Sequence, residues 1–121
     1  MADKLTPKQK AQLGVLEALP ARFEQMHRLI EEIAGMRADE SVTRRLCRLL
    51  DESKAATNIV GLTALTETMG IMGMLARRTG GQQMKVRGLR EGLGSLRINF
   101  EGALRSASMG ESGESGEPPP S

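Results

Sequence analysis

The sequence predicts an all-α protein, and three observations support this prediction. Apolar residues make up 39% of the 121 residues, yet the only aromatic residues are Phe23 and Phe100. A core of Leu, Ile, Val and Met suits packed helices better than strands, in which aromatic and β-branched residues dominate. Apolar residues also recur at steps of three and four along most of the chain, which is the period of an amphipathic helix.

A chain of this length holds one domain rather than two. We expect a helical bundle over residues 1–107. From 108 to 121 the sequence is poor in apolar residues and rich in Gly, Ser, Glu and Pro, and this composition predicts a disordered tail.

The N-terminal segment predicts a short helix followed by a longer one. Thr6, Pro7 and Gln9 have the spacing of a capping box with proline at the first helical position. Because Pro20 interrupts the pattern, and proline inside a helix usually kinks or breaks it, we expect helices at about 7–18 and 20–35. The apolar stripe of this segment is Leu13, Leu16, Leu19, Phe23, Met26, Ile30 and Ile33.

The next helix is predicted to have one buried and one solvent-facing side. Residues 35–40 predict a loop, Asp39 or Ser41 is a candidate N-cap, and Gly61 predicts the C-terminal end. The inward positions are Val42, Leu46, Leu49, Leu50, Ser53, Ala56 and Val60. The solvent-facing positions are Arg44, Arg48, Asp51, Lys54, Ala55 and Asn58.

A further helix is predicted to start at Thr63. Its glycines, Gly70 and Gly73, are interpreted as sites of close backbone packing. The methionines at helical spacing, Met69, Met72 and Met74, are interpreted as core rather than as an adaptable binding surface. The other core positions of this helix are Leu65 and either Leu75 or Ala76.

The last helix follows a turn predicted at Thr79, Gly80 and Gly81 and runs to about Ser106. Its core positions are Val86, Leu89, Leu93, Leu96, Phe100 and Leu104. From Arg77 to Arg105, seven basic residues stand against two acidic ones, Glu91 and Glu101. Such an excess is usual for a solvated helix face but would also attract nucleic acid. The aromatic residues that stack on bases are lacking.

The sequence offers little catalytic chemistry. With one histidine and one cysteine in the chain, no zinc site with clustered ligands and no catalytic triad is expected, and no cofactor is implied. We therefore expect no enzyme activity. Cys47 has no disulfide partner, and no segment is apolar enough to span a membrane, so we expect a soluble cytoplasmic protein. His27, with Ile30 three residues on and Glu31 four residues on, is interpreted as a surface or boundary residue of its helix.

The segment RRLCRLLDESKAATNIVGLTALTETM resembles the core of histidine-containing phosphotransfer (HPt) domains. Their pattern is a histidine, two residues, a lysine and a glycine, then small residues and a second glycine. Asp51 stands at the histidine position, Lys54 at the lysine, Ala55 at the first glycine and Gly61 at the last. The resemblance implies an up-and-down four-helix bundle with an extra N-terminal helix. It also implies a docking face, on the helix that carries Asp51, for receiver domains or histidine kinases.

Two departures from the HPt pattern change the expected function. Asp51 cannot form a phosphohistidine, and Ala55 adds a methyl group where glycine lets the partner come close. The expected function is therefore that of a signalling adaptor, a degenerate HPt-like protein that binds its partner without carrying phosphate. Asp51 either imitates a phosphorylated state or reflects sequence drift at a position that no longer needs the chemistry. The expected partner-binding residues are Arg44, Arg48, Asp51, Lys54, Ala55 and Asn58.

Arginine and lysine side chains on this face would complement the acidic pocket of a receiver domain, whereas the Asp51 carboxylate would repel it. The alternative function is a basic helical scaffold or nucleic-acid-associated regulator that uses Arg87, Arg90 and Arg97. The sequence also allows a homodimer through the Met and Gly surface of the helix that begins at Thr63.

Overall fold

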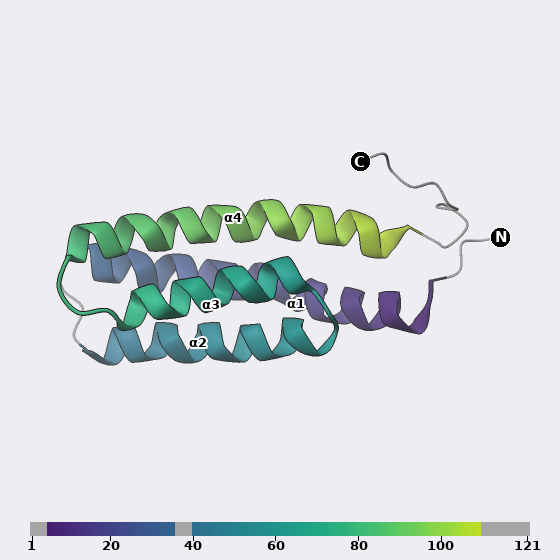
Figure 1. Ribbon diagram of the computed structural model, residues 1–121, viewed down its shortest axis with the longest axis horizontal. Helices are drawn as coiled ribbons and strands as arrows, with labels where there is room; N and C mark the ends of the chain where they lie inside the picture. Colours follow the sequence, from purple (N-terminus) through teal and green to yellow (C-terminus); the bar gives the residue numbers. More distant parts are fainter. Residues whose placement is uncertain (1–4, 36–39, 110–121) are drawn as a thin grey trace.

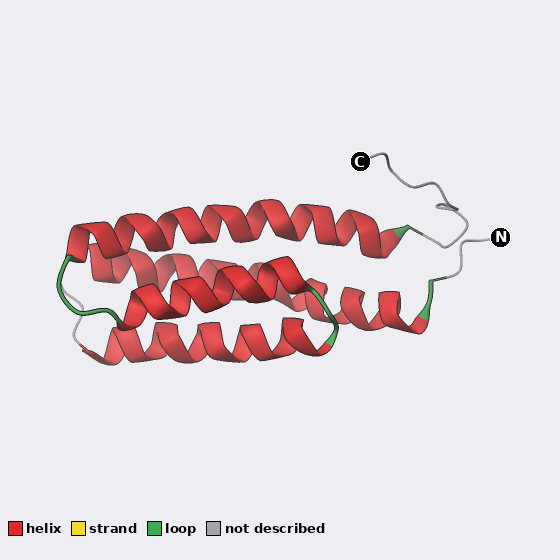
Figure 2. Cartoon of the chain, in the orientation of Figure 1, coloured by secondary structure: helices red, strands yellow, loops and turns green. Residues whose placement is uncertain are grey.

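The protein is a bundle of four helices in a computed structural model that describes residues 5–35 and 40–109. The described residues contain no strand (Figure 2). This confirms the all-α prediction. The helices are α1 (Pro7–Ala34), α2 (Glu40–Ile59), α3 (Thr63–Arg77) and α4 (Gln82–Ser108).

Each helix packs against the next one in the sequence, and α4 closes the bundle against α1. Consecutive helices run in opposite directions (Figure 1). The first and last helices are the longer ones, with 28 residues in α1 and 27 in α4, against 20 in α2 and 15 in α3. At the end where α2 turns into α3, the helices α1 and α4 therefore extend past the turn (Figure 1).

The two helices predicted on either side of Pro20 are one continuous helix, so the extra N-terminal helix is absent from the described residues. Leu16 and Leu19 before the proline, and Phe23 after it, are all buried in the same core. Burying such side chains stabilises the fold by roughly 1.5–3 kcal/mol each. Tertiary packing of a stripe that crosses Pro20 thus outweighs the roughly 3 kcal/mol that proline costs in a helix.

The predicted helix ends are mostly confirmed. The Thr6 hydroxyl accepts a hydrogen bond from the Gln9 backbone N–H at 3.0 Å, and the Gln9 side chain accepts one from the Thr6 N–H at 2.9 Å. Gly61 and Gly80 adopt φ values of 76° and 75°, a left-handed conformation that glycine reaches without strain. Ser41 lies inside α2, so it is not the N-cap.

The tail prediction lies outside the described residues from position 110 onward, and α4 continues to Ser108 rather than to about Ser106. The alternative N-cap Asp39 also falls outside the described residues.

The core contains most of the predicted inward residues, with a few corrections. Phe23 and the half-buried Phe100 meet edge to face, with ring centroids 5.7 Å apart. Ala56 and Val60 are only half-buried, and Thr57 is buried instead. The Thr57 hydroxyl lies 2.8 Å from that of Thr66 on α3, which satisfies both groups and makes this polar burial tolerable. The other predicted inward positions that are half-buried are Leu13, Leu75 and Leu104.

Close packing between α3 and α4 depends on glycines of α4. A Cβ atom built on Gly92 would lie 2.5 Å from Cγ of Met72, and one on Gly88 would lie 2.8 Å from Cδ1 of Leu75. On α3, by contrast, the predicted close packing at Gly70 involves a long side chain from α2: a Cβ there would meet Nζ of Lys54 at 3.5 Å. At Gly73 it would meet Nη1 of Arg77 at 3.0 Å.

Candidate functional site

The predicted solvent-facing side of α2 is exposed in the structure. Its opposite side packs into the core through Val42, Leu46 and Leu50, so the helical period directs the intervening polar residues outward. All six residues of the predicted docking face are exposed: Arg44, Arg48, Asp51, Lys54, Ala55 and Asn58.

Asp51 is tied to the neighbouring helix. Arg77, in the last turn of α3, donates a hydrogen bond from Nη2 to the Asp51 Oδ2 at 2.8 Å. The same guanidinium donates from Nη1 to the Gly73 carbonyl at 3.2 Å. Both side chains remain more than half exposed, at 53% for Arg77 and 58% for Asp51. The Asp51 carboxylate is therefore engaged within the molecule while staying accessible to a partner.

The exposed side of α2 continues onto α3. Lys54 lies over Gly70, and the same shallow groove is lined by Ile71 and Met74. These two apolar side chains are 59% and 67% exposed. The interpretation of Met74 as core is therefore wrong, whereas Met69 and Met72 are buried. The face combines exposed apolar groups with charges along its rim, the composition usual for a protein interface.

A larger open concavity of about 850 Å³ adjoins this face, where α2, the end of α3 and the start of α4 meet. Its basic lining residues are Arg44, Arg48, Arg77, Arg78 and Lys85. Its acidic lining residues are Glu40, Asp51 and Glu52. The excess of basic side chains makes the concavity electropositive.

Ion pairs engage the acidic residues of the lining and leave an excess of unpaired basic ones. Glu40 lies 3.4 Å from Arg44, and Glu52 lies 3.9 Å from Arg22 of α1. Together with the pair between Asp51 and Arg77, every acidic residue of the lining has a cationic neighbour. Within the described ranges no ion pair engages the remaining bases, which are Arg48, Arg78 and Lys85.

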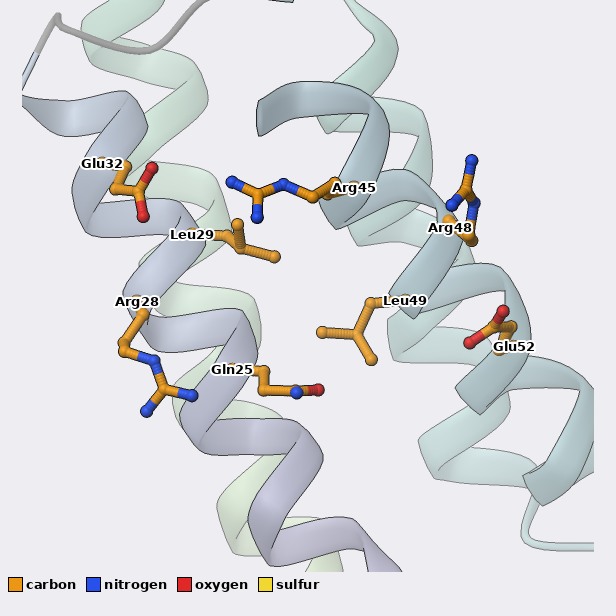
Figure 3. A pocket seen from close by; sticks show the side chains of 8 residues that line it. All are labelled: Gln25, Arg28, Leu29, Glu32, Arg45, Arg48, Leu49 and Glu52. Atoms are coloured by element: carbon orange, nitrogen blue, oxygen red, sulfur yellow. The ribbon is translucent and has the colours of Figure 1, made fainter. Parts of the chain in front are cut away.

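A separate groove of about 320 Å³ lies between α1 and α2 (Figure 3). Leu29 and Leu49 face one another across it, and Gln25 and Arg45 extend into it (Figure 3). Among the residues that the structure describes, its lining holds no Ser, Thr, Cys or His side chain. This part of the lining therefore offers neither the nucleophile nor the imidazole base that the commonest acyl-transfer sites use.

The histidine and the cysteine of the chain lie on different helices. His27 is exposed on α1, as predicted from its neighbours. Cys47 is half-buried on α2 with a free thiol and lines the electropositive concavity. Among the described residues no cluster of three His, Cys, Asp or Glu side chains could hold a metal ion, and no helix there could span a membrane.

Two of the three arginines of the alternative, nucleic-acid hypothesis are paired with α1. Arg90 donates to both carboxylate oxygens of Glu31 at 2.7 and 2.9 Å. This hydrogen bonding lowers the pKa of Glu31 and raises the pKa of Arg90. Arg97 lies 3.5 Å from Glu24. The outer charge of α4 is therefore partly neutralised by α1.

No protein-family model, curated protein or solved structure matches the chain.

The residues of α3 and α4 that contribute to the site were not predicted as binding residues. Arg77 and Arg78 appeared in the sequence only as part of a basic run, and Ile71 carried no signal. In the sequence, an apolar residue close to two glycines is compatible with a core position or a surface position. The helical period alone does not decide between them.

Proposed function

We propose that this protein is a non-catalytic signalling adaptor, similar to an HPt domain, that docks a receiver domain, a histidine kinase or another regulatory protein without carrying phosphate. The docking face is the exposed side of α2 together with the adjoining strip of α3. The observation that carries the proposal is the grouping of exposed polar residues around Asp51 with the apolar side chains of Ile71 and Met74.

The physical character of this face supports binding. Apolar groups that lose contact with water supply the affinity of most protein interfaces, and surrounding charges select the partner. Lys54 is exposed beside the apolar pair, and Ala55 is small enough to let a partner helix approach. The bundle presents both helices side by side (Figure 1).

The chemistry of the face supports binding without phosphoryl transfer. The position that resembles the phosphoaccepting histidine holds an aspartate, whose carboxylate is already bound to Arg77. His27 is on α1, and Glu31 lies one turn away from it. That carboxylate would repel a phosphoryl group rather than hold it.

A phosphotransfer assay tests both parts of the proposal. The purified protein is incubated with a panel of receiver domains carrying radiolabelled phosphate and of autophosphorylated histidine kinases, and complexes are separated by size-exclusion chromatography. We expect a complex with at least one of these partners and no label on this chain. Label on His27, or no complex with any receiver domain or histidine kinase, would contradict the proposal.

A matched pair of charge reversals locates the interface. Lys54→Glu changes the centre of the docking face, and Arg87→Glu changes an exposed arginine on α4, which does not pack against α2. We expect the first variant to weaken the complex by about tenfold and the second by about twofold or less. Equal weakening by both variants would mean that only the net charge matters.

A further inference from the structure

The concavity beside the docking face combines charges of both signs. The proposed partner-binding residues include a carboxylate, Asp51, among basic side chains. An acidic partner would be attracted by Arg48 and Lys54 and repelled by Asp51. The ion pair between Asp51 and Arg77 resolves this conflict.

We infer that Arg77 shields Asp51 and thereby makes the concavity between α2, α3 and α4 a docking site for a protein surface rich in carboxylates. This inference rests on the proposed function and specifies the chemistry of the partner. Arg77 acts through its contact with Asp51, so it is a positioning residue as well as a source of charge.

Geometry supports the shielding. The ion pair between Arg77 and Asp51 is the shortest of those that involve acidic residues of the concavity, at 2.8 Å against 3.4 and 3.9 Å. A second hydrogen bond of Arg77, to the Gly73 carbonyl, holds the guanidinium against α3. A Cβ atom at position 73 would lie 3.0 Å from Nη1 of Arg77, so the glycine leaves room for this placement.

Among the described residues that line the concavity, the charged side chains without an ion pair are all basic. With Asp51 neutralised, Arg48, Arg78 and Lys85 face the concavity from α2, from the end of α3 and from α4. In physiological salt, interactions between exposed charges are largely screened beyond about 8 Å. The attraction of a partner therefore depends more on these local charges than on the net charge of +2. Charge complementarity therefore selects an acidic surface.

The test uses a short glutamate peptide as the probe, titrated into the full-length protein at low salt and followed by amide chemical shifts of Arg48, Arg78 and Lys85. These shifts report binding at the concavity and not elsewhere on the molecule. The peptide needs no receiver domain, so failure of this inference and failure of the proposed function are separate results.

The variants are Arg77→Met, Asp51→Asn, their combination, and Arg87→Met as a matched arginine control on α4. We expect Arg77→Met to weaken peptide binding about three- to tenfold, because it removes one positive charge and uncovers one negative charge. Asp51→Asn should bind at least as tightly as the wild type. The double variant should return to within about twofold of the wild type.

The conservative variant Arg77→Lys, which keeps the charge, should retain binding, and the amide spectra report whether each variant is folded. Three results would overturn the inference: no peptide binding at the concavity, an Arg77→Met variant no weaker than Arg87→Met, or a double variant as weak as Arg77→Met alone.

Discussion

The packing of α3 against α4 predicts opposite effects for the same substitution at two glycines of one helix. Gly92 faces Met72, whose side chain is fully buried, whereas a methyl group added at Gly94 would have no neighbouring atom within 4 Å. We expect Gly94→Ala to stabilise the protein and Gly92→Ala to destabilise it.

The magnitudes follow from two terms. Replacing glycine by alanine inside a helix gains about 1 kcal/mol of helix propensity, and this is the whole effect at Gly94. At Gly92 the new methyl group would lie 2.5 Å from Cγ and 2.9 Å from Sδ of Met72. Overpacking of this kind costs about 1–3 kcal/mol, which outweighs the gain. The two variants should therefore differ by about 2 kcal/mol, or roughly 8 °C in Tm for a chain of this size.

Thermal unfolding followed by circular dichroism measures this difference. Gly88→Ala provides an intermediate case, because its methyl group would meet only the end of the half-buried Leu75 side chain, at 2.8 Å. The expected order of stability is Gly94→Ala, then Gly88→Ala, then Gly92→Ala. Equal stability of the Gly92 and Gly94 variants would refute the close approach of α3 to α4.

Three other predictions concern α1 and the docking face. Pro20→Ala should stabilise the protein by about 2 kcal/mol in urea unfolding, because it restores a helical hydrogen bond at an exposed position of a continuous helix; no gain would indicate a break at Pro20. The pKa of Glu31 is lowered by its pairing with Arg90, so this pairing stabilises the fold at pH values above the ordinary glutamate pKa of 4.5. The stabilisation is lost as the pH falls through the folded-state pKa. Glu31→Gln should therefore lower stability near pH 7 and lose this effect once the pH is below the folded-state pKa, and a pH-independent difference would contradict this assignment. Asp51→His should let the protein accept label from a receiver domain that binds it, because Lys54 and Arg77 then flank an imidazole; binding without label would argue against a phosphotransfer origin of this face.

Local signals predicted most of the helix ends. The capping box at Thr6 and the glycine turns at Gly61 and Gly80 depend on residues close together in the sequence, so the pattern is sufficient to find them. Pro20 was misjudged because its local preference conflicts with a buried stripe that extends through it. Local propensity predicts a break there, and packing against α2 and α4 overrides it.

The site was predictable only on α2. The helical period showed which side of α2 faces solvent, and all six expected residues are exposed. The contact between Asp51 and Arg77 joins residues 26 positions apart, and nothing in the local pattern predicts which basic residue reaches the carboxylate. The same holds for Arg78 and Lys85, whose place in the concavity follows from the packing of α3 between α2 and α4.

The most direct test of the docking face is an amide chemical-shift map of the isotope-labelled protein with an unlabelled receiver domain. The account predicts that the shifts concentrate on residues 44–58 of α2 and 70–77 of α3 and disappear with Lys54→Glu. Shifts centred instead on the outer side of α4, around Arg87 and Ile98, or shifts unaffected by Lys54→Glu, would contradict it.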